Sequence, residues 1–272
     1  MTTLIPLDST LGVALIGIIL STLLFGITCF QVYMYYTQYC SHDHLVLKLL
    51  VAGLFTLDAF HVVLLVLFYY HYTVTNFGDY TSLLHITWSG IIQALLAHVI
   101  STIIQFLEYY LGYNILGTYA CILFTAFTIL WAVTTFQLDL FTSVESNDLW
   151  SITALSTNAA CDMLIASSMI FYLAKKRTAF ARTNMVITRL ITYALNTCLL
   201  TTICGTACVI AYVTDGNSTF VEGLFLLILA RLYVCCFVST LNSRETMRQD
   251  LSKGSGSNCF ITLSHIGGDA SA

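Results

Sequence analysis

Seven apolar segments, each long enough to cross a lipid bilayer, occupy most of this 272-residue chain. A spanning helix needs about 20 mostly apolar residues, and the loops between these segments are too short to hold a folded domain. Only 9% of the residues are charged, against about 25% in soluble domains, so the chain cannot cover a surface exposed to water. We therefore predict an all-α integral membrane bundle of seven transmembrane helices. The expected spans are about 11–36, 46–71, 86–110, 115–137, 150–174, 187–212 and 220–242.

The distribution of basic residues predicts the orientation of these spans. With the N-terminus outside, nine of the ten Lys and Arg residues lie on the inner side, and the outer loops carry acidic residues only. The tenth, Arg231, falls within the last span. The segment 243–272 is polar and rich in Gly and Ser, which predicts a disordered cytoplasmic tail. The plasma membrane is the default location. The sequon at Asn217 lies in an outer loop so short that we expect little glycosylation.

Five ionisable residues fall near the middle of predicted spans, where a charge costs about 2.5–3.5 kcal/mol on insertion scales. One histidine lies a turn away from an aspartate on the same helical face. We treat the five as a candidate intramembrane polar cluster, with three readings open. They hold the helices together by hydrogen bonds, they form a ligand or proton site, or they do not meet. The five are Asp58, His61, His98, Asp162 and Arg231.

Two further polar groups accompany this cluster. On the third span, Ser101, Gln105 and Glu108 share one helical face with His98, which suits either the packed face of a bundle helix or the wall of a cavity. A cytoplasmic basic loop follows the fifth span. It contacts either anionic lipid headgroups, at about 1 kcal/mol for each basic residue, or a cytosolic protein. Its basic residues are Lys175, Lys176, Arg177, Arg182 and Arg189.

Several stretches within residues 7–248 resemble an uncharacterised family of fungal, chiefly basidiomycete, seven-span membrane proteins, which is known as a domain of unknown function. The resemblance includes Leu57-Asp58-Ala59-Phe60-His61 and is densest from Asp162-Met163-Leu164-Ile165-Ala166 to Arg182-Thr183-Asn184. It implies a membrane location and a fungal source, and no known reaction or ligand. After the third span such proteins tend to carry a basic residue among aromatic ones, which Glu108-Tyr109-Tyr110 lacks.

These features leave several functions open. Seven spans and a basic third inner loop favour a receptor or sensor, although no span carries a central Lys for a retinal Schiff base. A proton-coupled carrier would use the intramembrane aspartates and arginine. A non-catalytic scaffold fits equally well. An intramembrane haem or redox protein would need His61 and His98 as axial ligands, and we expect no catalytic residue, cofactor or metal. The net charge of −4 gives no basic surface for nucleic acid, and the sequence identifies no ligand.

Overall fold

The computed structural model describes residues 7–39, 43–79, 82, 87–112, 148–175, 181–215 and 220–266, with single helical positions between 122 and 133. This part of the chain consists of helices and turns and contains no strand. Three π-helical segments, η1, η2 and η4, extend the first two helices: Asp8–Gly12 and Tyr35–Tyr39 flank α1, and His71–Thr75 follows α2. The α-helices are α1 (Val13–Met34), α2 (Leu45–Tyr70), α3 (Trp88–Gly112), α5 (Asp148–Lys175), α6 (Ala181–Asp215) and α7 (Val221–Ile266).

Four helical stretches among the described residues are long and apolar enough to cross a membrane. They are Asp8–Tyr39, Leu45–Thr75, Trp88–Leu107 and Val221–Ser243. Many of their large apolar side chains, such as Ile16, Leu23 and Phe60, are exposed on the outside of the bundle. Exposed apolar surface on this scale is rare in soluble monomers and is what a lipid-facing surface requires. The described bundle is therefore that of a membrane protein with several spanning helices.

Two of the remaining predicted spans coincide with long helices, and one falls outside the described residues. Helices α5 and α6 cover the predicted spans 150–174 and 187–212, although within them the described side chains give only one shorter apolar stretch, Leu199–Thr214. The predicted fourth span, 115–137, lies outside the described residues apart from single helical positions. The number seven therefore stays a prediction, as does the orientation of the termini.

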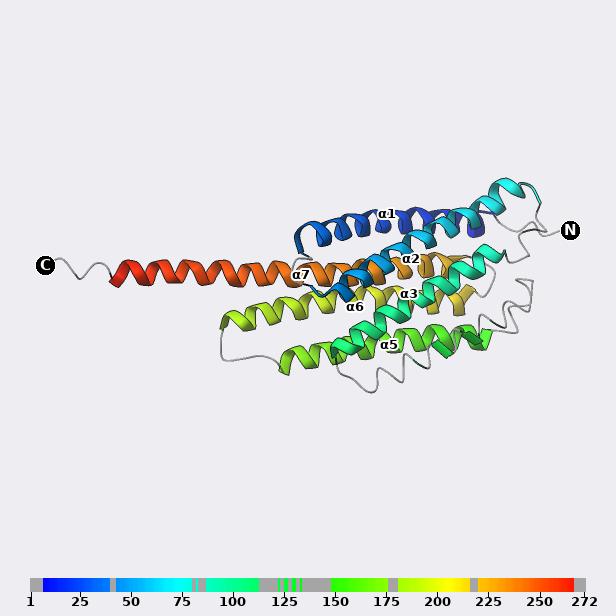
Figure 1. The fold of residues 1–272 in the computed structure, drawn as a ribbon. Helices are drawn as coiled ribbons and strands as arrows, with labels where there is room; N and C mark the ends of the chain where they lie inside the picture. Colours follow the sequence, from blue (N-terminus) through cyan, green and yellow to red (C-terminus); the bar gives the residue numbers. More distant parts are fainter. Residues whose placement is uncertain are drawn as a thin grey trace.

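The last helix differs from its prediction at its C-terminal end. We expected an irregular tail from residue 243, but α7 continues as helix to Ile266. Figure 1 shows this extension running beyond the other helices, at the end of the bundle where α5 ends and α6 begins. The Gly and Ser residues at 254–257 lower the helix propensity without interrupting the backbone hydrogen bonding. Residue 242 is therefore not the end of the last helix.

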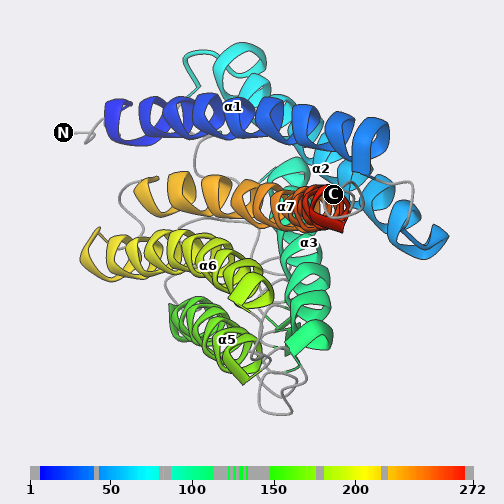
Figure 2. The same ribbon diagram turned by 90° about the vertical axis from the view of Figure 1, so that its left-hand side faces the viewer.

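Helix α7 is the central helix of the described bundle. More than half of its apolar stretch, 56%, is buried inside the protein, against 22% to 33% for the other three candidate spans. It packs most extensively against α1 and α6, and it also contacts α3 and α2. In Figure 2, α7 lies between α1 and α6, with α3 beside it and α5 on the far side of α6 from α1. Every other described helix is thus arranged around α7 or one layer away from it.

A glycine permits the close approach of α1 to α7. A Cβ atom at Gly17 would lie 3.2 Å from the Cα atom of Leu224 and 3.3 Å from Cδ1 of Leu227. The larger core lies further along the same pair of helices and includes Val32, Tyr35 and Val234. Small residues allow membrane helices to approach closely, because lipid supplies no hydrophobic drive for their association. The absence of a side chain at Gly17 therefore allows α1 to pack closely against α7.

The positions of the two termini test both the orientation and the odd number of spans. We expect an epitope tag at the N-terminus to bind antibody on intact cells, and a tag at the C-terminus to bind only after permeabilisation. Immunofluorescence of the two singly tagged proteins measures this. Tags on the same side of the membrane would require an even number of spans and contradict the predicted topology.

Candidate functional site

The most deeply buried charge in the described bundle is the guanidinium group of Arg231 on α7, which is 0% exposed. Its Nη1 atom donates a hydrogen bond to the Asp58 carboxylate oxygen Oδ1, with which it forms a salt bridge, and another at 2.8 Å to the Asp58 main-chain carbonyl. Its Nε atom donates to Ser21 Oγ at 3.0 Å. The ring of Phe25 lies 5.6 Å from the guanidinium carbon, within the range of a cation–π contact. Arg231 thereby joins α1, α2 and α7.

The fourth polar contact of Arg231 assigns the tautomer of His61. Nη2 lies 2.7 Å from His61 Nδ1. Because a guanidinium group only donates hydrogen bonds, Nδ1 must accept, and the proton of a neutral imidazole then sits on Nε2. His61 Nε2 is buried without a hydrogen-bond partner among the described residues. The second carboxylate oxygen of Asp58, Oδ2, is also buried without a hydrogen-bond partner among the described residues. We call Ser21, Asp58, His61 and Arg231 the arginine network.

A second polar group lies between α3, α5 and α7. The Gln105 side-chain Nε2 donates to Asn158 Oδ1 at 2.8 Å and to Asp162 Oδ1 at 2.9 Å. The hydroxyl of Tyr233 donates to the other Asp162 oxygen, Oδ2, at 2.7 Å and accepts from Asn158 Nδ2 at 3.1 Å. All of these contacts are buried. We call Gln105, Asn158, Asp162 and Tyr233 the amide network.

The two networks compensate the buried carboxyl group by different kinds of partner. Asp58 is paired with a cation, whereas both oxygens of Asp162 accept hydrogen bonds from neutral donors. Among the described residues Asp162 forms no salt bridge, and it is only 5% exposed. A charge in that position costs more than one neutralised by a partner, because hydrogen bonds compensate only part of the lost hydration. A negative charge on Asp162 therefore costs more free energy than one on Asp58.

The structure brings together some of the predicted cluster and separates the rest. Asp58, His61 and Arg231 are in direct contact. Asp162 lies apart from them in the amide network. The main-chain carbonyl of His98 accepts a bond from Ser101 Oγ at 2.9 Å. Of the candidate cluster, three residues therefore meet around Arg231, and Asp162 belongs to a second group of hydrogen bonds.

Some of the remaining predicted site residues are buried, one is exposed, and several lie outside the described residues. Ser101 and Gln105 are buried, so this part of the helix 3 stripe faces the interior. The side chains of Glu108, Arg182 and Arg189 lie outside the described residues, as do Lys176, Arg177 and Asn217 altogether. Lys175 is exposed at the end of α5. No group of three or more His, Cys, Asp or Glu that could hold a metal forms among the residues described.

Sequence reasoning missed three members of the networks: Ser21, Asn158 and Tyr233. Asn158 precedes Asp162 by four residues, a spacing that places the two side chains on one face of a helix. Tyr233 follows Arg231 by two residues, which places the side chains on opposite sides of a helix with 3.6 residues per turn. That spacing was available in the sequence. A serine such as Ser21 in an apolar helix carries no comparable signal.

Three of the four residues of the amide network, together with Arg231, lie within a match to a protein-family profile. Residues 158–246 match the profile of a family of unknown function. The segment is similar to the DUF6534 family. The match begins at Asn158, covers about a third of the chain and includes Asp162, Arg231 and Tyr233, so both networks include residues of the matched segment. The match carries neither a source organism nor a number of spans, which stay predictions. No curated protein and no solved structure shows a significant match to the chain.

Removal of one partner of the Arg231–Asp58 pair should destabilise the protein strongly. We expect Arg231→Met and Asp58→Leu each to lower the free energy of unfolding by about 3–5 kcal/mol, because each leaves an uncompensated buried charge. The double variant should recover most of this loss, because no charge then remains unpaired. Unfolding in detergent with increasing denaturant measures all three. Thr56→Ala, on the exposed face of α2, is the control, and additive losses in the double variant would contradict the pairing.

A smaller effect is expected at the amide network. Tyr233→Phe keeps the ring and removes the hydroxyl that bridges Asp162 and Asn158, so it should cost about 0.6 kcal/mol and at most about 1.7 kcal/mol. The exposed Tyr33→Phe is the matched control. The same unfolding measurement applies. Equal stability of the two variants would mean that the Tyr233 hydroxyl does not hold α5 to α7.

Proposed function

We propose that this chain is a receptor-like or sensor-like multi-pass membrane protein that performs no reaction, and in which α7 carries a conformational change along the bundle. The observation that carries this proposal is that a single unbroken helix holds a buried polar network on each of two opposite sides and continues well beyond the bundle. The plasma membrane is the expected location. The following points support a signalling role over transport or a purely structural one.

The two networks give α7 a discrete resting position. Arg231 holds α7 to α1 and α2, and Tyr233, two residues later, holds it to α5. Hydrogen bonds lose strength beyond about 3.2 Å, so a displacement of 1–2 Å along the α7 axis would break contacts on both sides together. Packed interfaces of this kind favour distinct arrangements rather than gradual ones. A stimulus that shifts α7 would therefore be felt by both groups of helices.

The continuation of α7 offers a route from the networks to a cytosolic partner. From Arg231 to Ile266 the helix runs for about 50 Å at about 1.5 Å per residue. The end of α5, the start of α6 and the α7 extension lie at the same end of the bundle (Figure 1). The predicted basic loop spans that end: Lys175 ends α5, and Arg182 and Arg189 lie in the first turns of α6. We propose this basic region, residues 175–189, as the contact for a cytosolic protein or for anionic lipid headgroups. Movement of α7 would alter the surface next to this loop.

Mutation of the amide network tests the proposal without knowledge of a stimulus. We expect Tyr233→Phe to change the resting position of α7 and therefore to alter the transcriptome of cells that carry it in place of the wild type. Neutralisation of the basic loop, by Gln at all five positions between 175 and 189, should abolish that change in the combined variant. The four strains carry the wild type, Tyr233→Phe, the five Gln substitutions alone, or both sets of changes. RNA sequencing of these strains, with membrane expression matched, measures the effect.

One outcome would contradict the signalling role of the networks, and another would contradict their link to the basic region. Identical transcriptomes in all four strains, with a lowered stability of Tyr233→Phe, would leave the networks a purely structural role, as in a scaffold. A transcriptional change that persists with the loop neutralised would separate the networks from the proposed cytosolic contact. Tyr33→Phe serves again as the control for expression and handling.

A proton-coupled carrier is the second candidate, and one observation favours it. Asp162 is a buried carboxyl group without a cationic partner among the described residues, and such intramembrane acids line proton paths in other proteins. Asp162→Asn preserves the size of the side chain and removes its ability to exchange a proton. A carrier requires this variant to lose proton movement in reconstituted vesicles that hold a pH-sensitive dye, whereas a receptor does not.

A further inference from the structure

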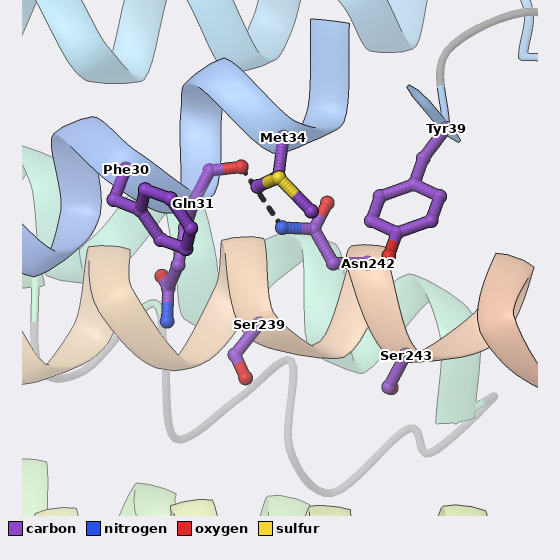
Figure 3. Close-up of a pocket in the computed structure, with 7 residues that line it drawn as sticks. All are labelled: Phe30, Gln31, Met34, Tyr39, Ser239, Asn242 and Ser243. Carbon is purple, nitrogen blue, oxygen red and sulfur yellow. Dashed lines mark hydrogen bonds between the residues drawn. The ribbon is translucent and has the colours of Figure 1, made fainter. Parts of the chain in front are cut away.

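Two acidic side chains, Asp58 and Asp162, are buried in the described bundle, and each contacts a residue of α7. A third polar contact of this helix involves no acid. There Asn242 Nδ2 donates at 2.9 Å to the Gln31 main-chain carbonyl, and the side chains drawn beside it are all uncharged (Figure 3). Arg231 compensates the charge of Asp58. Asp162 is therefore the buried acid that has no compensating cation among the described residues.

The other charged or ionisable groups described on the helices around Asp162 lie away from it or are uncharged. Helices α3 and α6 pack against α5, and α7 reaches Asp162 through Tyr233. The described Asp, Glu, Lys, Arg and His side chains on these helices, besides Asp162, are His98, Lys175, Glu222 and Arg231. Arg231 is engaged on the opposite side of α7, Lys175 and Glu222 lie at helix ends, and His98 is about two turns from Gln105. The remaining groups are thiols and phenols, which are mostly protonated at neutral pH.

The hydroxyl group of Tyr233 lies between two acceptors. Its oxygen is 2.7 Å from Asp162 Oδ2 and 3.3 Å from Asn158 Oδ1. A phenol has one hydrogen to donate and can rotate it about the C–O bond, so it serves one acceptor at a time. Asn158 Nδ2 donates to the same oxygen at 3.1 Å. The bond between Asp162 and Tyr233 can thus reverse its direction while both side chains stay in place.

Both charge states of Asp162 find hydrogen-bond partners in this arrangement. When the carboxyl group is ionised, Tyr233 donates to Oδ2 and Gln105 Nε2 donates to Oδ1 at 2.9 Å. When Oδ2 carries a proton, it donates to the Tyr233 oxygen over the same 2.7 Å, and the Tyr233 hydrogen turns to Asn158 Oδ1. Gln105 donates to Oδ1 in both states. The network therefore accommodates a proton on Asp162 by a change in hydrogen positions alone.

The protonated form avoids the main energetic cost of the buried carboxyl group. Asp162 is only 5% exposed, and its two hydrogen bonds come from neutral donors. An ionised carboxyl group that is buried without a cation loses more hydration energy than such bonds return. A proton on Oδ2 removes this cost and keeps the contacts to α3 and α7.

We propose that Asp162 is a proton-binding site, in which the proton is held on Oδ2 and exchanges with water. On release, the O–H bond of the carboxyl group breaks, water accepts the proton, and Tyr233 turns its hydrogen from Asn158 Oδ1 to Asp162 Oδ2. The site stands apart from the signalling role, because occupancy by a proton requires no movement of α7. It equally requires no path across the membrane, so it does not depend on a carrier function.

Infrared spectroscopy of the full-length protein in lipid nanodiscs tests this site. A protonated carboxyl group has a C=O band that is separate from the bands of carboxylates and of main-chain amides. At neutral pH we expect Asp162→Asn to remove one carboxylic acid band, with the intensity of one group per chain. In D₂O the wild-type band should move to lower frequency, because the bound proton exchanges. Asp79→Asn, which removes an exposed acid, is the matched control and should leave the band unchanged.

Two further measurements decide the question if Asp162→Asn fails to fold. Wild-type protein labelled with carbon-13 at the aspartate carboxyl groups should show an acid band that shifts with the label, and the lack of such a band would overturn the proposal. Tyr233→Phe should shift the same band, because the Oδ2 hydroxyl loses its acceptor, whereas the exposed Tyr33→Phe should not. A band that Tyr233→Phe or D₂O leaves unmoved, or that survives in folded Asp162→Asn, would contradict the proposal.

Discussion

The buried contact between Arg231 and Asp58 is the interaction on which the described bundle depends. A guanidinium group at full burial is tolerable only when its charge is neutralised and its N–H groups are occupied, and Asp58, His61 and Ser21 meet these needs from two other helices. Because these partners come from α1 and α2, the position of α7 is set by polar contacts with directional requirements. Apolar packing against lipid-like side chains could not specify it as narrowly, since lipid competes on equal terms.

The consequence for the fold is a central helix with two distinct sides. Arg231 and Tyr233 point to opposite sides of α7, and each ends in a network that includes a buried aspartate. Asp58 forms an ion pair, whereas Asp162 accepts hydrogen bonds from neutral donors. The arrangement therefore combines a strong contact on the α1–α2 side with weaker contacts on the α3–α5 side. Because both networks are held by one helix, a displacement of α7 along its axis would strain the two together, with the larger cost on the side of the ion pair.

Much of this arrangement could be anticipated from the sequence, for identifiable reasons. Hydropathy located α1, α2, α3 and α5 to within two residues, whereas α6 begins at Ala181, six residues before its predicted span. The cost of intramembrane charge singled out Asp58, Asp162 and Arg231. The grouping could not be anticipated, because depth along a span does not determine which side of a helix meets which neighbour. The sequence places Asp162 near the depth of Arg231, and yet Asp162 contacts Tyr233. The continuation of α7 to Ile266 was missed because Gly and Ser composition argued for an irregular chain.

The central claim is that α7 couples the two networks, and a double-mutant cycle between them measures this most directly. Ser21→Ala weakens the arginine network without exposing its ion pair, and Tyr233→Phe weakens the amide network; the free energies of unfolding of both single variants and the double variant complete the cycle. Coupling through α7 predicts that the double variant departs from additivity by more than about 0.5 kcal/mol, although the two side chains share no partner. Additive losses within about 0.3 kcal/mol would show two independent contacts on one helix and contradict the account.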